Sequence, residues 1–71
     1  MRYTVVIEEG PESFGASVPD LPGCIAVGQT RAEAMQLIRE AIEFHIEGLR
    51  EEGLEIPVPH TSAEQVEVAA A

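Results

Sequence analysis

The stretch that decides the fold is VPDLPGCIAVGQT, residues Val18 to Thr30. It holds two of the five prolines, two of the six glycines, and the only aspartate and only cysteine of the 71-residue chain. Such a concentration of special residues has two explanations, an active-site loop or a rigid corner between two strands. The residue types inside the stretch and the patterns on either side of it bear on this choice.

The prolines of this stretch favour the corner. Pro19 and Pro22 each fix one backbone angle and lack an N–H donor, so neither fits inside a central strand. Pro22-Gly23 is typical of the middle of a tight turn, because glycine adopts positive φ freely. We expect Asp20 to cap its own backbone. We also expect Asp20 and Leu21 to be exposed and available to a partner, since loops carry binding sites more often than strands do.

Short strands are predicted on both sides of the corner. Alternating and β-branched residues predict strands over 2–9, 14–18 and 24–28, and the turn between the first two is short enough for a hairpin. Tyr3, Val5 and Ile7 share one face of the first strand. Alternation over 65–69 predicts a short last strand. The expected core residues are Val5, Ile7, Val18, Ile38, Ala41, Ile42 and Leu49.

A long helix is predicted over 31–52. Thr30 followed by Glu33 forms a capping box at its start, and Gly53 stands where a glycine ends a helix. At about 100° per residue the apolar arc covers roughly 200°, twice what one core contact needs. We therefore expect one flank to meet a second chain in a homodimer or larger assembly, through Leu37 and Phe44 on one side or Met35 and Ile46 on the other.

The charge of the chain bears on its partners. Thirteen acidic residues against four arginines give a formal net charge of −9. This charge repels phosphate backbones, so direct nucleic-acid binding is not expected, whereas a basic protein partner fits. Acidity that only maintains solubility is the alternative. The candidate docking residues on the helix are Glu40, Glu43, Glu47 and Glu51.

The cellular compartment is predicted from the length of the apolar runs, the first ten residues and the number of cysteines. No apolar run reaches the ~20 residues that a membrane span needs. The first ten residues become acidic too soon for a signal peptide, and the chain has a single cysteine. We expect a cytoplasmic protein without membrane association.

Catalytic groups are few. Cys24 is the obvious nucleophile, but it has no basic neighbour in sequence, so a buried hydrophobic role is expected. His45 lies on the apolar side of the helix and His60 in a loop, and neither has metal-ligand spacing. We expect no catalytic residue, metal or cofactor. The open alternative is a metal-dependent nuclease site, for which Glu8, Asp20 and Glu40 are the candidate ligands.

Four motifs together resemble the HicB-type antitoxin domain. They are Y-x-V-x-I at 3–7, VPDLPGC at 18–24, GQT-x-x-EA at 28–34 and G-x-x-IP-x-P at 53–59. The combination of the second and third is specific. The motif residues, which we expect to be structural, are Pro19, Asp20, Leu21, Pro22, Gly23, Cys24, Gly28, Thr30 and Glu33.

The resemblance implies a fold, a partner and a role. It implies one α+β domain over 1–71, with a core match to residue 59 and a short tail over 60–71. The fold would be a βββαβ partial ribonuclease H-like fold: an antiparallel three-stranded meander, a long helix on one face and a fourth strand beside the first. The role would be to neutralise a small basic RNA-cleaving HicA-type toxin.

Two further points follow from the resemblance. Related antitoxins usually carry a C-terminal DNA-binding module, and the residues after Pro59 are too few for one. A stand-alone protein is therefore expected, without that module's autoregulation. The alternative role is an orphan self-associating domain with an unrelated protein partner.

Overall fold

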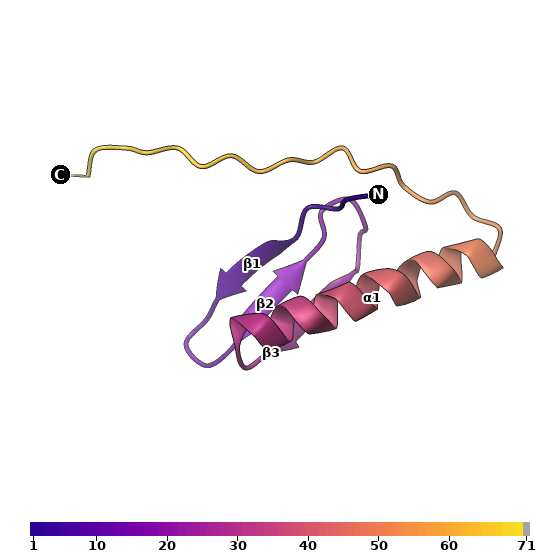
Figure 1. Ribbon diagram of the computed structural model, residues 1–71, viewed down its shortest axis with the longest axis horizontal. Helices are drawn as coiled ribbons and strands as arrows, with labels where there is room; N and C mark the ends of the chain where they lie inside the picture. The colour runs from indigo at the N-terminus through magenta and orange to yellow at the C-terminus, as the bar shows by residue number, and fades with distance from the viewer. Residues whose placement is uncertain (71) are drawn as a thin grey trace.

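The computed structural model describes residues 1–70; Ala71, the last residue of the expected tail, lies outside them. The elements are β1 (Val6–Glu9), β2 (Phe14–Ser17), β3 (Ile25–Gly28) and α1 (Arg31–Glu51). The strands form an antiparallel sheet in the order β1-β2-β3, and α1 lies across one face (Figure 1). The α+β class and the meander are confirmed. No helix in residues 1–70 has the length and apolarity to cross a bilayer.

The core lies between the sheet and α1. The register aligns Ile7, Ala16 and Ala26 on the face under the helix. The buried apolar residues are Ala16, Val18, Leu21, Cys24, Ala34 and Ile38. Most of the expected core is confirmed: Val18 and Ile38 are buried, and the residues packed against them are Val5, Ile7, Ala41 and Ile42. Leu49 is half-buried outside this cluster.

The stretch after β2 is a rigid corner made of two consecutive turns, each with proline in its second position. The Leu21 N–H donates to the Val18 carbonyl, and the Cys24 N–H donates to the Leu21 carbonyl, both at 3.0 Å. Gly23 has φ of +84°, as the second turn requires. The Val18 N–H donates to the Cys24 carbonyl at 3.2 Å, and this hydrogen bond joins the two ends of the corner. The predicted corner is confirmed.

Both ends of α1 are capped as the sequence predicts. The Glu33 N–H donates to Thr30 Oγ1 at 3.0 Å, and the Glu33 carboxylate accepts from the Gln29 N–H at 2.9 Å. At the other end Gly53 has φ of +68°, and the Leu54 N–H reaches the Leu49 carbonyl at 2.8 Å. This is the Schellman arrangement. The helix ends at Glu51, one residue before the predicted end.

Gly28 is required by the close approach of β3 to the start of α1. A Cβ placed there would lie 2.6 Å from the Ala34 backbone nitrogen. We expect Gly28→Ala to lower the free energy of unfolding by about 1–3 kcal/mol, because backbone on both sides must shift. Gly48→Ala is the control: its Cβ would meet nothing within 4 Å, and alanine raises helix stability by up to about 1 kcal/mol. Urea unfolding measures both, and equal stabilities would contradict the close approach.

The expected fourth strand is absent from the described part of the tail. Residues 54–70 form no strand, and Val66 and Val68 are 79% and 76% exposed. The prediction over 65–69 was wrong because an alternating pattern forms a strand only where a neighbour covers its apolar side. The tail instead leaves α1 and runs back past the N-terminus in an extended conformation (Figure 1).

Candidate functional site

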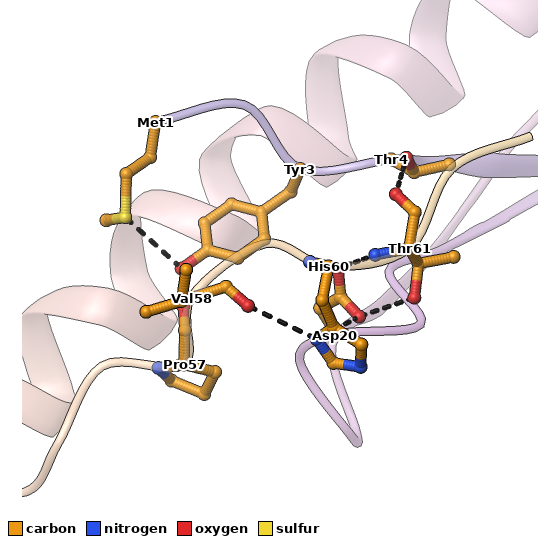
Figure 2. Close-up of polar contacts among 8 residues, drawn as sticks. All are labelled: Met1, Tyr3, Thr4, Asp20, Pro57, Val58, His60 and Thr61. Atoms are coloured by element: carbon orange, nitrogen blue, oxygen red, sulfur yellow. Dashed lines mark hydrogen bonds and ion pairs between the residues drawn. The ribbon is translucent and has the colours of Figure 1, made fainter.

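Asp20 holds the tail to the corner, as Figure 2 shows. Its Oδ2 accepts the backbone N–H groups of His60 and Thr61, both at 3.0 Å. Its Oδ1 accepts the Thr61 hydroxyl at 2.5 Å and lies 3.1 Å from His60 Nδ1. One carboxylate therefore binds two neighbouring residues of the tail about forty positions further along the chain.

Two side chains from the N-terminal segment hold the same part of the tail. The Tyr3 hydroxyl donates to the Pro57 carbonyl at 2.5 Å, and the Thr4 hydroxyl donates to the Thr61 carbonyl at 2.7 Å (Figure 2). We call Tyr3, Thr4, Asp20, His60 and Thr61 the tail clamp. The clamp accounts for the position of residues 57–61 without any strand pairing.

The clamp corrects two expectations for Asp20. Asp20 caps the tail rather than its own backbone. It is 5% exposed and Leu21 is fully buried, so the predicted exposed contact at this pair was wrong. The consecutive turns direct both side chains into the protein, where the Thr61 hydroxyl and the His60 and Thr61 N–H groups bind the carboxylate. These hydrogen bonds hold the pKa of Asp20 below its usual value, although burial opposes them.

The candidate catalytic groups do not form a reactive site. Cys24 is buried, and burial raises the pKa of its thiol, which disfavours the nucleophilic thiolate. Within residues 1–70, no three His, Cys, Asp or Glu side chains come close enough together to hold a metal. Of the three proposed ligands, Glu8 and Glu40 are exposed, and both oxygens of Asp20 accept bonds from the tail. The nuclease alternative therefore finds no support in the geometry.

The outer side of α1 carries an acidic surface. It consists of four exposed carboxylates and one aromatic ring: Glu40, Glu43, Glu47, Glu51 and Phe44. Helical spacing places the ring next to Glu40 and Glu47, four positions before and three after it. Among the described residues, no arginine or histidine lies within ion-pair distance of these carboxylates. Phe44 is 84% exposed, the most exposed large apolar side chain of the molecule.

The four expected interface residues do not form one patch. Phe44 and Leu37 lie two turns apart on one flank, and Leu37 is 37% exposed. Met35 lies on the other flank and lines an open groove of about 350 Å³ between α1 and the N-terminal segment. Ile46 is half-buried. Glu40, Glu47 and Glu51 lie on the side of the first pair, whereas Glu43 lines the groove beside Met35.

The sequence interpretation missed most of the tail clamp. Tyr3 was assigned to a strand face, Thr61 was given no role, and His60 was left without a partner. One signal was present: twelve acids of this chain are glutamates and only one is an aspartate. A single short carboxylate between two prolines indicates a position where its length matters. The partners themselves were not accessible from local patterns.

Comparison with known proteins shows the family. Residues 3–70 match the sequence profile described as the HicB-like antitoxin of bacterial toxin-antitoxin systems. The chain belongs to this family. The predicted resemblance is thereby confirmed.

Relatives of this HicB-like chain differ in length. It is 39% identical over 71 residues to a UPF0150 protein of Thermoplasma acidophilum and spans that protein's whole length. It is 47% identical over 57 residues to an uncharacterized 14.9 kDa protein of Haemophilus phage HP1, of which it spans 43%. It is 35% identical over 71 residues to antitoxin HicB 2 of Photorhabdus laumondii, of which it spans 51%.

A solved structure supports the same assignment. The HicB-like chain superposes on one chain of a HicA3 and HicB3 toxin-antitoxin complex with a TM-score of 0.71 and 35% identity. The match covers 84% of this chain and 70% of the other. The sheet and helix described above are therefore an arrangement also found in a solved toxin-antitoxin assembly.

Proposed function

We propose that this HicB-like chain binds a small basic toxin of the HicA type and inhibits it by binding alone, without catalysis. The observation that carries the proposal is the acidic surface, where an 84%-exposed phenylalanine stands among four carboxylates on one helix. Family membership and the similarity to a chain of a HicA3 and HicB3 complex support it. The order of three strands and a helix also suits the partial ribonuclease H-like fold.

The composition of the acidic surface suits a basic partner for physical reasons. An exposed aromatic ring inside a polar rim has the form of an interface hot spot, because it buries a large area when a partner covers it. The net charge of −9 attracts a basic protein from a distance and speeds the encounter. Glu43 and Glu47 repel each other at helical spacing, and a basic partner relieves that repulsion.

The test is inhibition of RNA cleavage by the HicA-like protein that co-purifies with the tagged chain near 0.15 M salt. We expect stoichiometric inhibition that weakens at high salt, because salt screens exposed charges. Phe44→Ala should raise the dissociation constant about 30-fold or more, as expected for an interface anchor worth at least ~2 kcal/mol.

A paired variant and a control complete the test. Glu43→Gln with Glu47→Gln should weaken toxin binding and, by removing a like-charge pair, raise the melting temperature slightly. Glu64→Gln, an exposed acid on the tail, should change neither. Unchanged affinity of Phe44→Ala and of the double variant would contradict the proposed surface, and uninhibited RNA cleavage would contradict the proposed function.

A further inference from the structure

The face of the sheet that α1 does not cover carries a shallow hollow of about 210 Å³. Its floor lies over the central strand β2, whose residues on this face are Gly15 and Ser17. One wall is formed by Ile25 and Val27 of β3, which are 68% and 63% exposed, and the other by Glu8 of β1. The register places Glu8, Gly15 and Val27 in one row across the three strands.

The fold itself gives no reason for a glycine at position 15. The φ of Gly15 is not positive, and the register through it contains no bulge. Within residues 1–70, a Cβ at this position would meet only the Glu8 carbonyl oxygen, at an ordinary 3.9 Å. Glycine weakens a strand relative to alanine, and where neither a bulge nor a bend explains it, such a glycine indicates close approach of another molecule. Gly15 therefore points to an occupant of the hollow.

Size and charge together indicate the kind of occupant. Small-molecule sites usually have volumes of about 300–1,000 Å³, so the hollow suits a single side chain better than a cofactor. Within residues 1–70, Glu8 is the one charged residue that lines it. An apolar side chain would cover part of this carboxylate without pairing it, which costs free energy, whereas a cation pairs with it. Ile25 and Val27 suit the aliphatic stem that long basic side chains lay along apolar surfaces.

We propose that the hollow is a docking site for an arginine side chain of a basic protein other than the toxin. Arginine fits better than lysine, because its planar guanidinium is weakly hydrated and donates in several directions. The lining offers two acceptors to it, the Glu8 carboxylate and the Ser17 hydroxyl. The net charge of −9 also attracts a basic partner to this face.

The position of the hollow assigns it to a second partner. α1 packs on the opposite face of the sheet, and the acidic surface lies on the outer side of α1 (Figure 1). The sheet and the helix therefore separate the two sites, and a small toxin on the acidic surface leaves the hollow open. The chemistry of the hollow is independent of the proposed function, so the two can be tested separately.

A peptide titration followed by NMR tests the proposal. The probe is a blocked tripeptide with arginine between two glycines, and its matched control has glutamine in place of arginine. We expect the arginine peptide to shift the Gly15 and Val27 amides of the isotope-labelled chain to saturation, with a Kd of about 1–10 mM, the range of a single weak contact. The glutamine peptide should not shift them. A saturating amount of the HicA-like toxin should leave the Kd of the arginine peptide unchanged.

Two variants and a control test the residues of the hollow. Glu8→Gln should raise the Kd of the arginine peptide about 5-fold or more, because the pairing of opposite charges is lost. Gly15→Val fills the hollow from its floor and should raise the Kd about 10-fold or more. The melting temperature of Gly15→Val should be unchanged or higher, because valine favours strands. Glu9→Gln changes the next residue of β1, which does not line the hollow, and should alter neither quantity.

Four results would overturn the proposal. The first is that the two peptides shift the Gly15 and Val27 amides equally or not at all, and the second is a Kd that neither Glu8→Gln nor Gly15→Val changes. The third is displacement of the arginine peptide by the toxin, which would assign the hollow to the toxin. The fourth is loss of folding in Gly15→Val, because the fold itself would then require the glycine.

Discussion

Replacing Leu21 with alanine should remove a large part of the free energy of unfolding of the chain. Leu21 and Ile38 are the largest fully buried side chains, and Leu21 lies where the two turns of the corner meet. A buried leucine-to-alanine change costs about 2–5 kcal/mol. A folded chain of 71 residues is stable by only roughly 4–11 kcal/mol, so the substitution removes much of the total. Circular dichroism against temperature and urea measures the loss.

Leu54→Ala is the matched control for this prediction. It removes the same atoms from a leucine that is 53% exposed, just beyond the end of α1. We expect a loss below about 1 kcal/mol, because little apolar area returns to water. Similar losses at the two positions would show that the corner does not depend on its buried leucine.

Replacing Asp20 with asparagine should release the tail. Asparagine keeps the shape but turns one acceptor oxygen into a donor, so tail donors on that side lose their acceptor and meet another donor. We expect the melting temperature to fall by roughly 5–15 °C and the His60 and Thr61 amides to lose protection from exchange. Glu64→Gln makes the same change at an exposed tail position and should have neither effect. Full protection of both amides in Asp20→Asn would contradict the tail clamp.

The pH dependence of the same pair of proteins separates the charge of Asp20 from its shape. The pKa of Asp20 is lower in the folded chain than its ordinary value of 3.8. The ionised Asp20 carboxylate therefore stabilises the fold fully above about pH 4. This stabilisation is lost as the pH falls through the lower pKa that Asp20 has in the folded chain. The melting-temperature difference between wild type and Asp20→Asn, taken at pH 5, should shrink as the pH falls below 4. The glutamates titrate in both proteins, so their effect cancels in this difference.

The parts of the fold that could be predicted are those governed by local chemistry. Prolines, a glycine with positive φ and a capping threonine act within a few residues, so the corner and the ends of α1 were accessible from sequence. The same holds for Cys24, whose lack of basic neighbours indicated a buried thiol. The acidic surface was also accessible, because helical spacing alone brings Glu40, Glu43 and Glu47 together.

The parts that could not be predicted depend on contacts between distant residues. The neighbours of Asp20 in the sequence predict a turn residue. Its bond to Thr61 forms only because the tail folds back over the corner. The predicted strand over 65–69 was wrong for the same reason, because the alternation of Val66 and Val68 does not show whether another element covers their side chains. The hollow at Gly15 follows from strand order and register, which local patterns do not specify.

The central claim is that the acidic surface of α1 binds the partner and that the Val18–Cys24 corner is structural. The most direct test is to titrate the isotope-labelled chain with its HicA-like toxin and follow backbone amide shifts by NMR. We predict that the largest shifts cluster around Phe44 on α1, while the amides of Leu21 and Cys24 stay unmoved. Shifts that centre on the corner and leave the helix unchanged would contradict the account.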